Sequence, residues 1–323
     1  MSDMKDKWII IVNVYAASKR AGSLWRNAES MLMDKGVDYQ CRMTGVDGNA
    51  CELARRAAED GYRNIVAVGG DGTVHDVLNG IMQYVTGCSG KTSLSEFTLA
   101  VIPMGSGNDW IRSTGVPRNI RKAVSLIASG SFIRQDVVKV SLLSDDSVKT
   151  ISYMVNIGGV GIDADVCRVV NVNKKLGYRG KILYVIALLQ CLAKRVPTPV
   201  RLICDGREFF SGNIFSIAFG VGRYSGGGMR QTADAVLDDG LVDVTLIPDI
   251  SLMTIAKRAY RLFTGTFTKV KELSVTRCRT VDVIPSGNRP YVEVDGEVIG
   301  NAPVRFEVLP EQINVLGRGR CDC

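Results

Sequence analysis

Hydrophobic and polar positions in the first part of the chain alternate between strand-like segments and helical spacing. The strand-like segments predict strands at residues 8–13, 37–43, 65–68 and 98–102. Helical spacing predicts helices at residues 24–35, 49–61, 74–81 and 120–128. In the third helix, Val74, Val77, Leu78 and Ile81 form one apolar stripe. Strands and helices that alternate at these lengths indicate a parallel sheet covered by helices.

From about residue 137 the pattern changes to short segments, many with alternating apolar and polar residues. They predict strands at residues 137–143, 150–157, 200–204, 213–220, 241–247, 273–277, 280–284, 291–295 and 304–308. Helical spacing interrupts them near residues 179–194 and 251–264. We therefore predict an α/β plus β fold. An N-terminal parallel-sheet α/β domain covers residues 1–136, and a C-terminal, mostly antiparallel β-sandwich domain covers residues 137–323, with a last strand that could return to the first domain.

Composition narrows the function classes. The 323 residues include 40 Lys and Arg against 33 Asp and Glu, a net charge of +7 spread along the chain. This charge suits nucleotide phosphates, a membrane surface or nucleic acid, and is equally compatible with solubility alone. The nine cysteines include no CxxC pair, which argues against a disulfide framework and favours a reducing compartment. His75 is the only histidine, which excludes an HExxH zinc site.

The apolar segments favour a cytoplasmic protein that is soluble or peripheral to a membrane. The longest of them, residues 182–192, is too short to span a bilayer, and the N-terminus lacks a signal-peptide pattern. Residues 178–195 and 252–271 combine apolar and basic positions, and such helices could lie on an anionic membrane. Packing against the β domain is the favoured role for both.

A glycine-rich turn, Gly69 to Thr73, joins the strand at 65–68 to the helix at 74–81. Glycines let consecutive N–H groups face one point, and the helix start adds partial positive charge. The turn therefore predicts a phosphate site, although no Walker A or GxGxxG sequence occurs and a tight turn without a ligand is equally compatible. Asp71 favours the functional interpretation, since a carboxylate among phosphates requires a metal ion or a proton transfer to be useful.

A second polar loop, Ser106 to Asp109, follows the strand at 98–102. Alone it indicates a helix cap. In parallel sheets, however, ligands bind beyond the carboxyl ends of the strands. Asn13, Thr44 and both glycine loops follow such ends, so we expect one crevice to gather them.

Two turns in the second domain carry neighbouring carboxylates. Asp238-Asp239-Gly240 follows the glycine run at 226–228 and indicates either a β-turn or part of a Mg²⁺ site. Asp295-Gly296-Glu297 indicates either a hairpin turn or two carboxylates presented to a hydroxyl group that must lose a proton. These residues alone leave both choices open.

Together and in this order, the motifs resemble those of the soluble diacylglycerol kinase and sphingosine kinase superfamily, in particular its bacterial lipid kinases. The resemblance spans about residues 9–316. The matching segments are GGDGT at 69–73 with the NG pair at 79–80, PMGSGND at 103–109 with serine in place of threonine, NIGGVGID at 156–163, GGGMRQTADAVLDDGLVD at 226–243 and DGE at 295–297. GGDGT is shared with NAD kinases, whereas the GGGM and DDGL block is not.

The resemblance implies a two-domain fold that binds ATP in a cleft between the domains. It implies nucleotide contacts from Asn13, Thr44, Gly69, Gly70, Asp71, Gly72, Thr73, Ser106 and Asn108. It also implies a structural Mg²⁺ site at Asp239, with the carbonyl groups of Val236 and Leu241. Glu297 would deprotonate the lipid hydroxyl, with Asp295 beside it and Asp71 across the cleft.

We therefore predict an ATP-dependent lipid kinase that uses Mg²⁺. Diacylglycerol is the first predicted substrate, giving phosphatidic acid, and a sphingoid base or another lipid alcohol is left open. The expected partners are the lipid substrate at a membrane surface and anionic phospholipid, without nucleic acid, and a homodimer is left open. The alternatives are a kinase of a soluble substrate such as NAD, and a non-catalytic nucleotide- or lipid-binding protein on the same fold.

Overall fold

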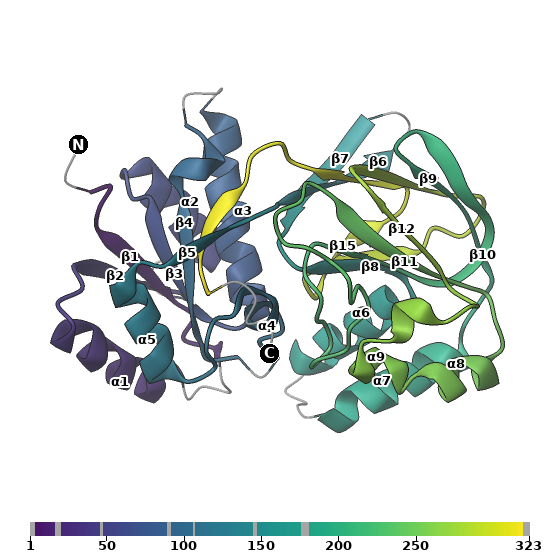
Figure 1. Ribbon diagram of the computed structural model, residues 1–323, viewed down its shortest axis with the longest axis horizontal. Coiled ribbons are helices and arrows are strands. Elements are labelled where there is room, and N and C mark those ends of the chain that lie inside the picture. Colours follow the sequence, from purple (N-terminus) through teal and green to yellow (C-terminus); the bar gives the residue numbers. More distant parts are fainter. Residues whose placement is uncertain are drawn as a thin grey trace. The chain divides into compact units, whose positions relative to one another are not determined.

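The computed structural model describes residues 4–16, 21–45, 48–88, 92–105, 107–144, 147–175 and 181–318. They form two compact units. The first unit contains the described residues up to Val137, the loop Gly226–Gly228 and those from Pro310 onward, and the second contains the remainder. The predicted fold class is confirmed, because the first unit is built on a mostly parallel α/β sheet and the second is an antiparallel β unit close to a barrel (Figure 1).

The sheet of the first unit has six strands in the order β2-β1-β3-β4-β17-β5. They are β1 (Trp8–Val12), β2 (Tyr39–Met43), β3 (Asn64–Gly69), β4 (Thr98–Pro103), β5 (Phe132–Gln135) and β17 (Ile313–Leu316). All run parallel except β5, which pairs antiparallel with β17. Residues 9–12 and 65–68 are buried on both faces of the sheet, which explains their continuous apolar sequence.

Helices cover both faces of this sheet. α2 (Ala50–Glu59) and α3 (Asp71–Gly87) pack together on one face, and α1 (Ala21–Asp34) and α5 (Ile120–Ser129) on the other (Figure 1). Gly80 allows the close approach of α2 and α3, because a Cβ at this position would collide with the carbonyl oxygen of Cys51. Asn49 caps α2 as predicted, with its Oδ1 accepting the N–H of Glu52 at 2.9 Å.

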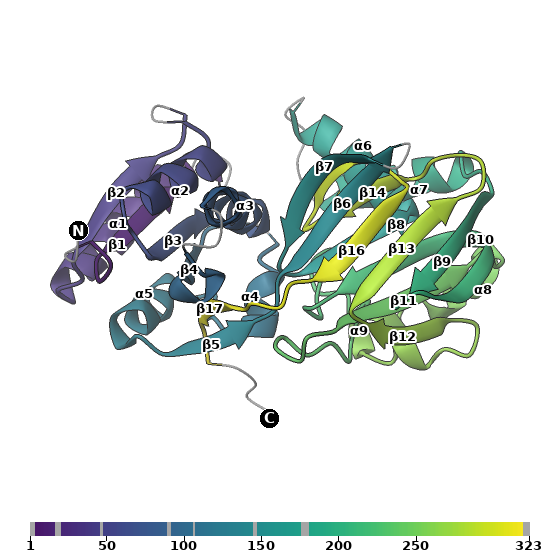
Figure 2. The ribbon, with the colours of Figure 1, turned by 90° about the horizontal axis from the view of Figure 1, so that it is seen from above.

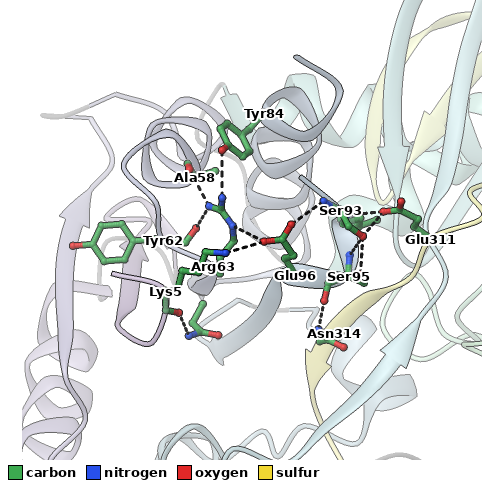
Figure 3. A network of polar contacts seen from close by, with 12 residues as sticks. Lys5, Ala58, Tyr62, Arg63, Tyr84, Ser93, Ser95, Glu96, Glu311 and Asn314 are labelled. Atoms are coloured by element: carbon green, nitrogen blue, oxygen red, sulfur yellow. Dashed lines mark hydrogen bonds and ion pairs between the residues drawn. The ribbon is translucent and has the colours of Figure 1, made fainter. Parts of the chain in front are cut away.

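The strand β17 lies between β4 and β5 although it is far from both in the sequence. A polar network fastens the chain around it (Figure 3). The Oε2 of Glu311 accepts hydrogen bonds from the hydroxyl of Ser93 at 2.8 Å and the N–H of Leu94 at 2.7 Å. The Nδ2 of Asn314 donates to the carbonyl of Ser95 at 2.7 Å. These bonds join β17 to the short 3-10 helix η2 (Leu94–Glu96) that precedes β4.

The second unit contains one antiparallel sheet of 11 strands (Figure 2). They are β6 (Val138–Ser144), β7 (Ser147–Met154), β8 (Ile157–Gly161), β9 (Thr198–Cys204), β10 (Arg207–Gly220), β11 (Val242–Pro248), β12 (Ser274–Cys278), β13 (Thr280–Pro285), β14 (Tyr291–Val294), β15 (Glu297–Asn301) and β16 (Val304–Val308). The first half of the long strand β10 pairs with β9, and its second half pairs with β8 and β11. One strand thus joins two parts of the sheet that would form separate layers in a sandwich.

The concave side of this sheet holds the core of the second unit. Phe219 and Phe306 stack there with ring centroids 4.1 Å apart. Four helices lie together at one end of the strands in Figure 1: α6 (Ile162–Lys175), α7 (Lys181–Ala193), α8 (Leu252–Arg258) and α9 (Arg261–Thr264). α6 packs on α7 through Val170, Leu183 and Ala187. No helix among the described residues combines the length and the hydrophobicity that a membrane span requires.

Candidate active site

Four neighbouring strand ends in the first unit bring several predicted nucleotide contacts together. β2, β1, β3 and β4 are adjacent and parallel, so their carboxyl ends share one edge. Asn13 follows β1, and its Nδ2 donates to the hydroxyl of Thr73 at 3.0 Å. Thr44 follows β2, and its hydroxyl accepts the N–H of Val14 at 3.3 Å. Asn13, Thr44 and Thr73 therefore surround the end of β1, as their positions in the sequence predict.

The two glycine loops of this unit contact each other through their backbones. A Cβ at Gly70 would lie 3.0 Å from the Cα of Gly105, and a Cβ at Gly105 would collide with the Cα of Gly70. A Cβ at Gly69 would strike the side chain of Thr73. The N–H of Met104 donates to the carbonyl of Gly69 at 2.7 Å. Both loops thus line the predicted phosphate site, which we call the cradle. Gly70 and Gly105 must be glycine because a Cβ at either position would press on the backbone of the other loop.

Asp71 joins the two loops through its carboxylate. It lies in the first turn of α3, where Gly72 follows it. Its Oδ2 accepts the N–H of Asp109 and its Oδ1 accepts the N–H of Trp110, both at 3.1 Å. These N–H groups open the short helix α4 (Trp110–Thr114) and have no partner inside it. Asp71 therefore holds α4 against α3, and its contact with a phosphate group or a metal ion stays a prediction.

The loop before α4 contains a further acidic residue, which belongs to the loop of the predicted crevice but was not among the predicted nucleotide contacts. Asp109 is 5% exposed, its Oδ2 accepts the N–H of Gly227 at 2.6 Å, and its Oδ1 lies 3.3 Å from the Nε of Arg112. Asn108 has a φ of +50°, and its Nδ2 donates to the carbonyl of Gly105 at 2.7 Å. The GND motif and the glycine run at 226–228 were the available signals for Asp109. Ser106, a predicted nucleotide contact, lies outside the described residues.

The DGE motif forms the turn of the hairpin between β14 and β15 in the second unit. Asp295 and Gly296 have φ values of +51° and +88°, as in a type I′ turn. The Asp295 carboxylate is buried, and it accepts the N–H of Asn156 at 2.9 Å and that of Val155 at 3.1 Å. The hairpin interpretation is thus confirmed. Asp295 fastens this turn to the connection between β7 and β8.

Glu297 follows the turn and is exposed. Its Oε2 lies 3.4 Å from the Nδ2 of Asn171 in α6. The same Nδ2 donates to the carbonyl of Gly296 at 3.0 Å, and the thiol of Cys167 donates to this carbonyl at 2.8 Å. Two side chains one helical turn apart therefore hold the residue that precedes Glu297. Sequence reasoning did not select Asn171 or Cys167, because neither lies in a motif.

Two buried carboxyl groups lie close to the DGE turn. The Oε2 of Glu293 in β14 accepts the N–H of Gly296 at 2.9 Å. Asp163, at the start of α6, accepts hydrogen bonds from the hydroxyl of Ser216 at 2.6 Å and the Nε2 of Gln231 at 2.9 Å. Burial raises the pKa of Glu293 well above its ordinary value, and the nearby carboxylates add to this effect. Burial also raises the pKa of Asp163.

Asp239, the predicted Mg²⁺ ligand, lies in a turn and pairs with a cation. Its Oδ1 accepts the N–H of Leu241 at 3.1 Å, and its Oδ2 pairs with Arg277. Arg277 also donates to the Oδ2 of Asp243 at 3.1 Å, so two carboxylates share one guanidinium group. In the described ranges, no three His, Cys, Asp or Glu side chains gather as metal ligands. A carboxylate oxygen is a ligand type that Mg²⁺ prefers, but Leu241 and Arg277 engage both oxygens of Asp239, so the Mg²⁺ site at Asp239, Val236 and Leu241 stays a prediction.

Two family models match successive parts of the chain, and the second of them also covers Gly226–Gly228 and β17 of the first unit. A family model for the diacylglycerol kinase catalytic domain matches residues 7–140. A model for the YegS C-terminal NAD kinase beta sandwich-like domain matches residues 156–317.

Similar proteins match nearly the whole chain. A Stenotrophomonas maltophilia (strain K279a) protein named "Probable lipid kinase YegS-like" is 30% identical over 96% of this chain and 95% of its own. A Mycobacterium tuberculosis protein named "Diacylglycerol kinase" is 28% identical over 90% of this chain and 88% of its own. Two solved structures from Bacillus anthracis strain Sterne share the fold, with TM-scores of 0.74 and 0.69 at 21% and 18% identity, and each comparison covers 97% of both chains. The second of these is described as a diacylglycerol kinase.

Proposed function

The chain belongs to the diacylglycerol kinase catalytic-domain family, with a C-terminal β domain of the YegS type, and we propose that it transfers the γ-phosphate of ATP to a lipid hydroxyl group. One observation carries this proposal. The exposed carboxylate of Glu297 stands on a hydrogen-bonded turn, in a chain whose other unit contains two glycine loops in contact at the start of a helix, an arrangement that suits phosphate. Diacylglycerol is the proposed substrate, and the enzyme would act while peripherally attached to the cytoplasmic face of a membrane.

The first unit would hold the nucleotide. Phosphoryl transfer requires mainly positioning and stabilisation of charge on the phosphate oxygens. The first N–H groups of α3 and the hydroxyl of Thr73 supply donors at the cradle, and Asn13 keeps that hydroxyl oriented through its 3.0 Å hydrogen bond. Asp71 and the contact of Gly70 with Gly105 keep the two loops rigid, so that little reorganisation accompanies binding.

The second unit would supply the proton acceptor. The lipid hydroxyl oxygen attacks the γ-phosphorus, the bond from this phosphorus to the bridging oxygen breaks, and ADP leaves. The hydroxyl proton passes to the carboxylate of Glu297. Asp295 and Asn171 would act as positioning residues, because one fixes the turn to the neighbouring strands and the other bonds to Gly296 and Glu297.

A Mg²⁺ ion at Asp239, with the carbonyl groups of Val236 and Leu241, would have a structural role. It would offset the negative charge that Asp239 and Asp243 share beside Arg277. The proton transfer to Glu297 does not depend on this ion.

The proposal is tested by incubating the protein and labelled ATP with a mixed lipid extract and identifying the labelled product by mass. Phosphatidic acid is the expected product. Another phosphorylated lipid alcohol would change the substrate but keep the reaction. Phosphorylation of NAD in detergent-free buffer, with no labelled lipid, would select a soluble-substrate kinase instead. Absence of turnover on the whole lipid panel, with ATP binding intact, would indicate a non-catalytic binding protein.

A further inference from the structure

The helices α8 and α9 are unusual within the second unit because their apolar side chains are uncovered. All their residues are described, and none is buried. Met253 is 68% exposed, Tyr260 and Phe263 are each 60% exposed, and Leu252 is 45% exposed. The amphipathic pattern of residues 252–271 predicts packing against the β domain as the favoured role. The structure agrees only in part, since Phe267 and Val270 are buried whereas Leu252, Met253, Tyr260 and Phe263 are exposed.

The charged residues of the segment that contains α8 and α9 are all basic. Residues 251–271 contain no Asp or Glu. Their five basic residues are Lys257, Arg258, Arg261, Lys269 and Lys271. Arg258 lies 3.3 Å from Glu272, just beyond the segment, so part of its charge is compensated. Exposed apolar side chains are therefore interspersed with cations, and no anion of the segment neutralises them.

A backbone hydrogen bond and two buried side chains connect the segment to the rest of the second unit. The N–H of Arg230 donates to the carbonyl of Leu262 at 2.7 Å. Phe267 and Val270, directly after α9, are 6% and 4% exposed and connect it to the core. The uncovered side chains thus belong to a fixed element of the unit. Their exposure is a property of its surface.

The neighbouring helix α7 adds to the uncovered apolar area. Ile186, Leu188 and Leu189 are exposed on it. Arg195, shortly after α7, forms an ion pair of 2.7 Å with Asp249, shortly before α8. α7, α8 and α9 lie at the same end of the strands in Figure 1.

We propose that α8 and α9 form the surface by which the protein docks on an anionic lipid bilayer. Amphipathic helices with basic residues and large apolar side chains lie in the interface of such membranes. Each Lys or Arg near an anionic surface strengthens binding by about fivefold. The segment has five cations, of which Arg258 is paired with Glu272, and no acidic residue of its own, which matches a uniformly negative surface. The inference rests on the proposed function only in that a kinase of a lipid alcohol must reach a membrane.

The test measures sedimentation of the full chain with vesicles of phosphatidylcholine, with and without phosphatidylserine, at low and high salt. We expect binding to the anionic vesicles that weakens with salt. The double variant Lys257→Glu/Arg261→Glu should bind these vesicles more than about 30-fold more weakly, since two cations are lost and two anions are added. Met253→Ser/Phe263→Ser should weaken binding at high salt as well, because it removes apolar contact.

The matched controls lie on β7, where Val148 and Ile151 are 54% and 46% exposed beside Lys149. Val148→Ser/Ile151→Ser and Lys149→Glu should bind as the wild type does. Three results would overturn the proposal. They are a loss of binding in the controls as large as in the α8 and α9 variants, wild-type binding to neutral vesicles as strong as to anionic ones, and binding by the α8 and α9 variants as strong as by the wild type. Binding to single-stranded RNA in place of anionic vesicles would overturn it in favour of a nucleic-acid surface.

A second readout separates docking from catalysis. With a short-chain diacylglycerol dispersed in detergent, the α8 and α9 variants should turn over ATP at the wild-type rate, and on vesicles they should be slower in proportion to their lost binding. If no lipid is phosphorylated while the vesicle results hold, the proposed function fails and the docking surface stands. If lipid is phosphorylated while wild-type protein ignores anionic vesicles, the docking surface fails and the proposed function stands.

Discussion

The glycine turn of the first unit and the DGE turn of the second use an aspartate in the same way. Asp71 accepts the two N–H groups at the start of α4, and Asp295 accepts those of Val155 and Asn156. The turns differ in the residues that come directly after them, because the exposed carboxylate of Glu297 follows the DGE turn, whereas Gly72 and Thr73 follow Asp71. The comparison indicates that each aspartate holds its loop in place, which supports the proposal that Glu297 accepts the proton.

Replacing Glu297 by Ala tests this difference between the two turns most directly, and it should have the largest effect on turnover. Turnover should fall by about 10²- to 10⁴-fold, the usual contribution of a positioned general base. The unfolding temperature should stay within about 1–2 °C of the wild type, because an exposed side chain contributes little to stability. Phosphoryl transfer is measured with labelled ATP, nucleotide binding by calorimetry and unfolding by circular dichroism. Glu208→Ala, an exposed acid of the same unit, is the control. Retained turnover in Glu297→Ala would contradict its role.

Replacing Asp71 or Asp295 by Asn should lower stability as well as activity, unlike the Glu297 variant, which should lose activity alone. Each change removes a charged acceptor of two backbone N–H groups and turns an amide NH₂ toward one of them. We expect a loss of about 2–4 kcal/mol in the free energy of unfolding, with a parallel loss of activity. Urea unfolding measures the first and labelled ATP the second. A variant that keeps wild-type stability and loses turnover would show that its carboxylate takes part in the chemistry.

Asn171→Ala tests whether the position of the Glu297 carboxylate affects turnover, because Asn171 is uncharged and donates a hydrogen bond to this carboxylate. Its loss removes one hydrogen bond to Gly296 and one to Glu297. A typical hydrogen bond contributes about 0.5–1.5 kcal/mol, so kcat should fall by about 3- to 10-fold. The KM for ATP should not change, because α6 has no part in the predicted nucleotide contacts. Cys167→Ser keeps a donor to Gly296 and serves as the matched control. Equal effects of Asn171→Ala on kcat and on the KM for ATP would indicate general disruption.

The sequence predicts the fold class and most elements, because their apolar patterns are long and regular. It does not predict α6, whose Val166, Val169, Val170 and Val172 are β-branched and favour helices weakly. This helix forms because Val166, Val169 and Val170 pack against α7. Asn171 and Cys167 were missed with it. The partners of Asp71 could not be predicted either, since they lie 38 and 39 positions away and depend on the contact between the two loops.

The last expected effect depends on pH and concerns Glu293, the buried acid next to the DGE turn. Its folded-state pKa is raised, so the folded protein holds this proton more tightly than the unfolded chain does. Stability should therefore decrease as the pH rises above the unfolded value of about 4.3, until the pH passes the folded pKa. Glu293→Gln removes this titration and keeps an acceptor for the N–H of Gly296.

At about pH 3, roughly one unit below the unfolded pKa, the variant and the wild type should have similar free energies of unfolding, because the carboxyl group is protonated in both states. As the pH rises toward 8, the variant should become more stable than the wild type. The difference should grow by about 1.4 kcal/mol for each pH unit between the unfolded and the folded pKa of Glu293, and stay constant above the folded pKa. Urea unfolding at several pH values measures the difference, with Glu307→Gln on the exposed side of β16 as control. A difference that is constant with pH would mean that Glu293 is ionised in the folded protein. The N–H of Gly296 would then donate to an ionised carboxylate, and the DGE turn would contain a buried charge at Glu293 in addition to the hydrogen bonds of Asp295.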